Sequence, residues 1–376
     1  MEGWMNSETI ATRFFGGGGA NWSYTDAECF LCLTTLSPSN RTREHVFPKW
    51  LLKRHGLSNE TMTLQNGSRI PYRQLTIPCC LECNGTRLSQ VEKTTREAFE
   101  NGFEAVKEMD KRTLFFWLAK IFYGLLVKER HSLMDRRDDK GQTIAGDEDL
   151  SRFAMHHLLM QGVRGEASWV ASAEENPWSI FILKCQVSDS EPSLNFDYID
   201  SNEIPFLAIR SGEIAVVASL QDWGHLENSL EVKHMVAAQQ LELHPLQFKE
   251  AALIACYLSM AFFQDRRFML ASGEEQTTVV LMPLASTSMN FDPQLRYLAP
   301  SLAKHFGTDL DQVTDGQRVM STLCSSDGAP FRMDWDGSSN FPVPTIHPLG
   351  ADGVQAIQSS TGSNAHLPDI ELGSED

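Results

Sequence analysis

The chain has 376 residues, of which 42% are hydrophobic and 22% are charged, a length and composition typical of two or three globular domains. Its N-terminal residues do not combine a basic flank, an apolar run and a small-residue cleavage site, and no stretch holds about 18 uninterrupted apolar residues. We therefore expect neither secretion nor a membrane span, and we expect a cytoplasmic protein.

The net charge of −17 is spread unevenly along the chain. Residues 1–130 hold 17 Lys and Arg against 14 Asp and Glu, a balance of +3, whereas residues 131–376 hold 15 against 35, a balance of −20. Neutralisation of phosphates by cations dominates affinity for nucleic acid. The N-terminal third is therefore the expected contact surface for nucleic acid, and the acidic remainder is expected to face something else.

In chain order, residues 1–24 are expected to be a flexible N-terminus, because the four consecutive glycines at 16–19 are typical of a linker. Two cysteine pairs follow, Cys29-x-x-Cys32 and Cys80-x-x-Cys83. Pairs with this spacing can close a tetrahedral site, so we expect a structural Zn²⁺ held by these four thiolates. Cys79, next to the second pair, is interpreted as a buried thiol or an alternative ligand.

A dipeptide of an acid and a histidine, Glu44-His45, lies between the cysteine pairs; Pro48 stands three residues after the histidine, and Asn84 follows the second pair directly. Together with the cysteines, this pattern resembles the zinc-stapled branch of the HNH (His-Me finger) endonucleases. The resemblance covers about the first quarter of the chain. It implies a metal-dependent endonuclease that hydrolyses phosphodiester bonds in DNA and leaves a 5′ phosphate and a 3′ hydroxyl.

The resemblance also implies the roles of individual residues. His45 matches the general base, which takes the proton of the attacking water. Glu44 and Asn84 match the residues that hold a catalytic divalent cation, Mg²⁺ or Mn²⁺. The family's middle asparagine, which orients the loop of the catalytic histidine, has no counterpart here. Gln74 is the nearest polar substitute.

Local patterns around these residues predict the ββα unit of that family within a nuclease domain of residues 25–105. We expect strands at 42–47, 61–64 and 69–77, a short helix at 49–54 and a long helix at 80–101. Basic side chains in this region are expected to contact DNA: Arg41, Arg43, Lys49, Lys53, Arg54 and Arg87. A solvated basic face is the alternative reading of the same residues.

The rest of the chain is predicted to form a helical connector at 106–165, an α+β regulatory or oligomerisation domain at 166–333 and a disordered acidic tail at 334–376. Strands are expected at 178–184, 195–199, 205–210, 213–219 and 277–284, and helices at 112–129, 149–160, 246–264 and 293–305. The first of the two most apolar helices, 112–129, is expected to pack into the core. Both of them, with 246–264, could instead support a homodimer or a partner protein.

The remaining histidines are given little functional weight. His156 and His157 are adjacent on a predicted helix and are interpreted as a structural pair. His55 could meet a phosphate beside Arg54 or could simply end an exposed helix.

The sequence thus predicts an α+β protein whose N-terminal part is an HNH endonuclease, with bacterial anti-phage defence as a compatible setting. The alternative is a zinc-stapled nucleic-acid or protein binding module without nuclease activity.

Overall fold

The computed structural model describes residues 25–135, 137, 141–170, 176–228, 233–263, 268–273, 276–281, 294–314, 319–324, 329–339 and 347–348. These residues form an α+β fold, as predicted. The N-terminus predicted to be flexible and most of the predicted acidic tail lie outside the described residues. No helix in the described ranges is both long enough and apolar enough to cross a lipid bilayer.

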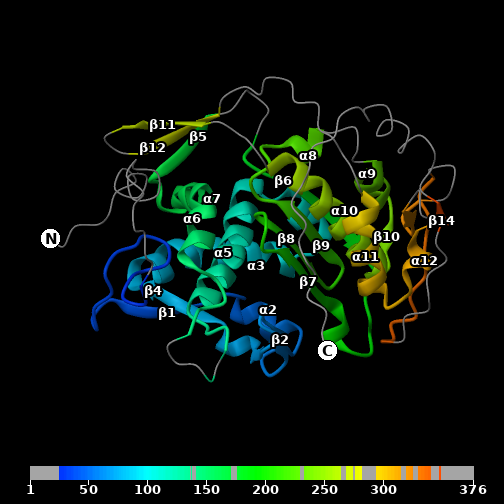
Figure 1. Ribbon diagram of the computed structural model, residues 1–376, viewed down its shortest axis with the longest axis horizontal. Helices are drawn as coiled ribbons and strands as arrows, with labels where there is room; N and C mark the ends of the chain where they lie inside the picture. Colours follow the sequence, from blue (N-terminus) through cyan, green and yellow to red (C-terminus); the bar gives the residue numbers. More distant parts are fainter. Residues whose placement is uncertain are drawn as a thin grey trace.

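A five-stranded sheet forms the middle layer of the molecule (Figure 1). Its strand order is β10-β6-β9-β8-β7, in which all neighbours are antiparallel except the β10–β6 pair. The strands are β6 (Ser179–Cys185), β7 (Phe196–Ser201), β8 (Phe206–Ser211), β9 (Ile214–Ser219) and β10 (Glu242–Leu243). Consecutive hairpins therefore join β7, β8 and β9, and β6 pairs with β9 at the far end of this meander.

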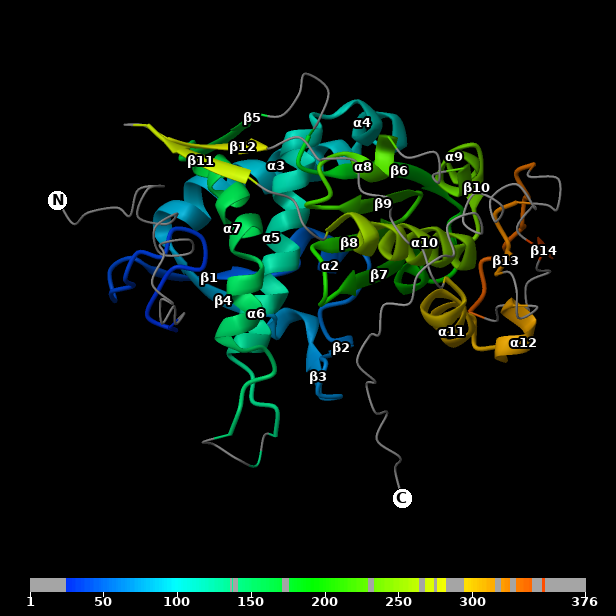
Figure 2. The same ribbon diagram turned by 45° about the horizontal axis from the view of Figure 1, so that its top comes forward.

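Both faces of this sheet are covered, because every residue of β8 and β9 is buried. Leu207 and Ile209 belong to the apolar core shared with the N-terminal elements. Phe206 and Ala208, which alternate with them, belong to a second core on the opposite face. Helices α9 (Lys233–Gln239), α10 (Pro245–Phe263) and α11 (Gln294–Phe306) lie against that second core, as Figure 2 shows.

Helix α5 (Lys111–Arg130) lies between the five-stranded sheet and the N-terminal strands (Figures 1 and 2). The side chain of Asp110 caps its first turn by accepting hydrogen bonds from the backbone N–H groups of Arg112 and Thr113. All residues from Leu114 to Val127 are buried, so the predicted burial of this helix in the core is confirmed. Three helices pack against it: α3 (Ser89–Glu100), α6 (Asp147–Arg152) and α7 (Ala154–Met160). The short α4 (Phe103–Glu108) packs against α3 and β6.

The N-terminal part contains two short antiparallel ladders. Strand β1 (Arg41–His45) pairs with β4 (Thr76–Cys80), and β2 (Thr61–Thr63) pairs with β3 (Arg69–Pro71). The strand predicted at 69–77 is therefore two strands separated by a 3₁₀ turn, η1 (Tyr72–Gln74). Proline offers no backbone N–H for pairing, and β3 ends at Pro71.

The helices of this part differ from prediction in one place. The short helix expected at 49–54 is α2 (Lys49–Arg54), with the predicted bounds. The helix expected at 80–101 is interrupted instead, because Cys80 still belongs to β4 and residues Cys83–Leu88 form a π-helical turn, η2, before α3. Such turns add a residue to the helical repeat. Here the turn carries the last cysteine and Asn84 next to β1.

A separate three-stranded sheet, in the order β11-β12-β5, lies near α6 and α7 (Figure 1). Its strands are β5 (Ala167–Val170), β11 (Phe268–Ser272) and β12 (Thr277–Leu281). The sequence predicted β12, as a strand at 277–284, whereas β5 and β11 were missed.

The remaining short elements are η3 (Gln161–Arg164), η4 (Pro192–Asn195), α8 (His225–Asn228), α12 (Leu310–Val313), β13 (Met320–Ser321) and β14 (His347–Pro348). One apolar core holds residues from Cys29 to Val279 and so extends across the boundaries predicted near 105 and 165. The described start of the predicted acidic tail also contacts the fold: the backbone N–H of Trp335 donates to Gln186, and Ser188 donates to the carbonyl of Gly337.

Candidate functional site

The four predicted zinc ligands come together in the structure. Cys29, Cys32, Cys80 and Cys83 are all buried, and their sulfur atoms lie within 4.8 Å of one another. The Cys32 and Cys80 sulfurs are 3.7 Å apart. A tetrahedral Zn²⁺ with Zn–S distances of about 2.3 Å requires sulfur–sulfur separations of about 3.8 Å. The group could therefore hold zinc with little rearrangement.

The electrostatics of the four sulfurs indicate the same kind of ligand. Hydrogen bonds from the Cys29 and Cys80 thiols hold the pKa of Cys32 far below its ordinary value, whereas burial raises the pKa of Cys29. A divalent cation that prefers sulfur would stabilise all four groups as thiolates.

The fifth cysteine of this region, Cys79, lies beside the group without belonging to it. Its sulfur is 3.8 Å from that of Cys29, and its side chain is fully buried on β4. The sulfur of Cys80, by contrast, accepts a hydrogen bond from the backbone N–H of Cys83, which closes the second pair into a tight turn. This geometry agrees with the predicted ligand Cys80 and with the reading of Cys79 as a buried thiol.

The first cysteine pair is held from outside by the region around α7. The Nε2 atom of His157 lies 3.0 Å from the carbonyl oxygen of Phe30, and the side-chain amide of Gln161 donates to the carbonyl of Leu31 at 2.8 Å. His156 is also fully buried, with Nε2 3.4 Å from the carbonyl of Ala119. Both histidines are buried and lie within hydrogen-bond distance of backbone carbonyls, which agrees with their structural reading, and His157 contacts the backbone between Cys29 and Cys32.

Strand β1 presents its residues to two different environments. Arg41 and Arg43 are exposed and His45 is half-buried, whereas the intervening Glu44 is buried. Pairing with β4 sets Arg41 opposite Cys80 and His45 opposite Thr76. Successive side chains of a strand point to opposite faces. Glu44 therefore faces the helices, and His45 lies at the end of the strand with access to solvent.

Glu44 lies in a buried charge cluster with Lys120 of α5 and Glu92 of α3. The Lys120 Nζ atom is 2.8 Å from Glu44 Oε1 and 2.7 Å from Glu92 Oε1. It also donates to the backbone carbonyls of His45 at 2.8 Å and Val46 at 3.2 Å. Only 1% of the Lys120 side chain is exposed, compared with 8% for Glu44 and 25% for Glu92.

The pKa shifts in this cluster follow from burial and from its charge balance. Burial raises the pKa of Glu44 above its ordinary value, against the lowering effect of Lys120. Burial alone would lower the pKa of Lys120, but the carboxylates of Glu44 and Glu92 raise it overall. With both carboxylates and the ammonium ionised, two negative charges face one positive charge, so the cluster has one uncompensated negative charge.

His45 has the protonation state that a general base needs. Burial lowers its pKa below the ordinary value, and the neighbouring positive charges of Lys49 and Lys120 lower it further. The imidazole is therefore neutral at pH 7 and able to accept a proton.

Asn84 connects the π-helical turn to the same strand. Its side-chain nitrogen donates to the Thr42 hydroxyl at 3.0 Å and to the Arg43 carbonyl at 3.2 Å. Asn84, which follows the second cysteine pair, is thus in contact with β1, which lies between the two pairs along the chain. Gln74, the predicted substitute for the family's middle asparagine, is exposed at the end of η1.

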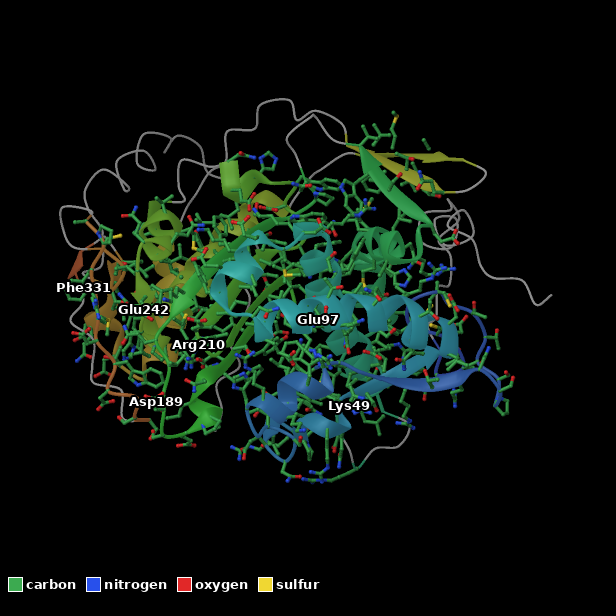
Figure 3. The ribbon with its side chains drawn as sticks, turned by 180° about the vertical axis from the view of Figure 1, so that it is seen from behind. Lys49, Glu97, Asp189, Arg210, Glu242 and Phe331 are labelled. Carbon is green, nitrogen blue, oxygen red and sulfur yellow. The ribbon has the colours of Figure 1, made fainter. Side chains whose placement is uncertain are left out.

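The predicted DNA contacts do not all have the same freedom. Lys49 and Lys53 are exposed on α2. In Figure 3, Lys49 lies apart from Arg210 and Glu242, which belong to the five-stranded sheet. Arg54 donates to the carbonyl of Phe99, and Arg87 pairs with Glu82 at 3.2 Å. Arg41 donates to the carbonyl of Asp26, and Arg43 lies 3.4 Å from Thr76.

His55 stands at the end of α2 but is buried, so the interpretation as an exposed helix end is wrong. It is buried between the Ser211 hydroxyl, 2.8 Å from Nε2, and the Pro192 carbonyl, 3.2 Å from Nδ1. Burial lowers its pKa to about 4. The histidine connects α2 to the C-terminal end of β8 in the five-stranded sheet.

Sequence reasoning missed Lys120 and Glu92. Lys120 is the single charged residue between Leu114 and Leu126, and a lone lysine in so apolar a helix must find a buried partner. That pattern could have indicated a buried ion pair. It could not have named the partners, because Glu44 is 76 positions away.

No protein-family model, curated protein or solved structure matches this chain.

Proposed function

We propose that the N-terminal part of this chain is a DNA endonuclease of the HNH type, in which His45 is the general base. The observation that carries the proposal is a neutral, half-buried imidazole at the end of β1, beside a strand that Asn84 ties to the buried four-cysteine group. An antiparallel strand pair followed by a helix, with a metal group joining its ends, is the arrangement that the resemblance implies.

In this proposal the residues of the chain divide the work of phosphodiester hydrolysis. The His45 ring accepts the proton of the attacking water, so that a hydroxide-like oxygen attacks the phosphorus while the 3′ oxygen leaves. The exposed Arg41, Arg43 and Lys49 face the phosphates of the substrate. The zinc group holds the second pair of cysteines and Asn84 in place and takes no part in the reaction.

A catalytic Mg²⁺ or Mn²⁺ is part of the proposal, and Glu44 and Asn84 are the residues that would hold it. When bound, such an ion supplies charge stabilisation for the phosphate and for the leaving oxygen. In Asn84 the amide nitrogen donates to β1, which leaves the amide oxygen as its ligand atom.

A specific observation favours a second candidate, a zinc-stapled binding module without nuclease activity. Glu44 is buried and forms an ion pair with Lys120 at 2.8 Å. A carboxylate paired in this way has a structural role already, so the cation would have to bind beside an existing ammonium group. Under this reading the basic residues would bind nucleic acid and His45 would have no catalytic role.

Plasmid cleavage separates the two candidates. The wild-type protein is incubated with supercoiled DNA and Mg²⁺ or Mn²⁺, alongside His45→Ala and, as a matched control, His305→Ala, an exposed histidine of α11. We expect His45→Ala to reduce the cleavage rate about 10²–10⁴-fold and His305→Ala to leave it unchanged. Binding of DNA without cleavage by the wild type would support the binding module. Cleavage that survives His45→Ala would remove His45 as the base.

A further inference from the structure

We propose that Lys120, which lies in α5 outside the predicted nuclease domain, is a positioning residue for His45. The inference rests on the proposed function and names a residue that neither the sequence pattern nor the resemblance assigns. Lys120 does not face the substrate. Its ammonium donates hydrogen bonds to the backbone carbonyls of His45 and Val46. These bonds fix the backbone from which the imidazole ring extends.

The contacts of Lys120 account for all of its hydrogen-bonding capacity. An ammonium group has three N–H donors, and four oxygen atoms lie within 3.2 Å of Nζ: Glu44 Oε1, Glu92 Oε1 and the carbonyls of His45 and Val46. Two of these acceptors are backbone carbonyls of consecutive residues. Both peptide units after the His45 side chain are therefore directed towards a single buried donor.

A lysine reaches this position only because the packing allows α5 to come close to β1. Gly124, one turn after Lys120 on the same face of the helix, packs against Val46 and Ile77. A Cβ at position 124 would lie 3.2 Å from Ile77 Cδ1, closer than side chains normally pack, and 3.4 Å from Val46 Cγ2. Glycine at 124 therefore keeps the helix near the strand end that Lys120 holds.

The neighbouring backbone contacts of the β1 end do not involve the carbonyls of His45 and Val46 that Lys120 binds. The ladder between β1 and β4 ends at His45–Thr76, and the next residue is bonded through its N–H, from Val46 to the carbonyl of Leu75. Gln74, which the sequence offered for orienting this loop, is exposed. Beyond Phe47 the chain turns at Pro48 into α2. Lys120 is thus the donor that fixes the two carbonyls at this turn.

The charge balance of the cluster allows positioning to be separated from electrostatics. With all three groups ionised the cluster has a net charge of −1; Glu92→Gln then changes it to 0, and the double variant Glu92→Gln/Lys120→Met, with Glu44 ionised, returns it to −1. Glu44 is retained in all three proteins. If Lys120 acted through its charge alone, the single variant would be impaired and the double variant restored. Positioning predicts the opposite order.

We expect Glu92→Gln to stay within about 3-fold of the wild-type kcat for DNA cleavage and the double variant to lose about 10- to 100-fold, because a small displacement of a reacting group has effects of that size. The KM for DNA should stay unchanged in both, since the basic surface residues are intact. Zinc content is measured for each protein. Asp197→Asn/Arg210→Met is the stability control, because it removes a buried ion pair on the opposite face of the sheet.

A spectroscopic readout keeps the proposal falsifiable if the double variant folds poorly. Glu44→Gln/Lys120→Met leaves Glu92, the more exposed carboxylate, as the one charge of the cluster. Its NMR spectrum should show changed carbonyl ¹³C shifts at residues 45 and 46 and a changed environment for the His45 ring, with the β8 and β9 signals unmoved.

The outcomes distinguish this inference from the function on which it rests. If the wild type does not cut DNA, the proposed function fails and this inference fails with it. If the wild type cuts and the charge-balanced double variant cuts as fast, or if the residue 45 and 46 carbonyl shifts stay unchanged, Lys120 is not a positioning residue and the endonuclease proposal stands.

Discussion

Two antiparallel ladders in this molecule have the same backbone geometry and are stabilised in opposite ways. The β8–β9 pair runs from Phe206↔Ser219 to Ser211↔Ile214, and all its residues are buried between two apolar cores. The β1–β4 pair runs from Arg41↔Cys80 to His45↔Thr76, and its side chains include exposed arginines, buried thiols and a buried carboxylate.

This difference in stabilisation indicates which kind of contact can hold a catalytic side chain in a fixed orientation. Apolar burial is strong but has no direction, so it holds a sheet together without aiming any one side chain. Thiolate–metal bonds and charged hydrogen bonds have preferred distances and angles. The β1–β4 ladder has charged hydrogen bonds from Lys120 and the Cys80 thiol of a group that could hold zinc, and it is also where the candidate catalytic residues lie. The following predictions test this contrast, from the largest expected effect to the smallest.

Removal of a zinc ligand should have the largest effect. We expect Cys80→Ser to abolish stoichiometric zinc binding and to unfold the β1–β4 region, because structural zinc sites contribute on the order of 10 kcal/mol. Cys79→Ser is the matched control, since its sulfur lies outside the four-cysteine group, and it should retain one zinc. Elemental analysis and thermal unfolding measure both. Loss of zinc in Cys79→Ser alone would reverse the assignment of the ligand.

Truncation in the apolar ladder should cost less and should leave the metal in place. Phe206 is fully buried on β8, so Phe206→Ala should lower the free energy of unfolding by about 3–5 kcal/mol. Val236→Ala, at a half-exposed site on α9, should change it by less than about 0.5 kcal/mol. Urea denaturation gives both values. If the Phe206→Ala protein folds but has lost its zinc, the two regions are not stabilised independently.

Acidification should destabilise the fold through two buried histidines, His156 beside α5 and His55 beside β8. Burial lowers the pKa of His156 to about 3 and that of His55 to about 4, from 6.5. As pH falls below 6.5 the unfolded chain binds protons that the folded chain does not, so stability falls; it is fully present above pH 6.5. Each residue should cost about 2 kcal/mol at pH 5.

The variant His156→Leu should therefore lose less stability than the wild type between pH 7 and pH 5. Denaturant unfolding at a series of pH values measures the slope. An unchanged slope would mean that His156 titrates in the folded protein near its ordinary value.

Removal of one exposed basic side chain should have the smallest effect. Arg43→Ala should weaken DNA binding by about 1 kcal/mol and reduce the slope of log K against log salt concentration by about 1. Lys184→Ala, on β6 of the acidic part, should change neither. Equal effects of the two substitutions would mean that DNA does not select the β1 face.

The elements of the fold were largely predictable because their signals are local. The apolar runs of β6, β8 and β9 and of helices α5 and α10 were each identified within a few residues. The two-residue spacers of the cysteine pairs were enough to select the four sulfurs that now lie together. Each of these signals depends on neighbouring residues along the chain, so no tertiary information was needed.

Features that depend on distant contacts were not predictable. The strand expected at 69–77 is interrupted at η1, which contacts α2, and the helix after Cys80 begins with a π-helical turn that contacts β1, β4 and η3. His55 became an internal contact because Ser211, 156 positions later, packs over it.

The sequence by itself determined the α+β class, the group of four thiols and the position of His45 beside an acid, because residue type and short spacing encode them. Only the tertiary structure decided what surrounds that histidine. Lys120 and Glu92 reach Glu44 through the packing of α3 and α5 against β1, and a desolvated ammonium can remain there only where two carboxylates converge on it.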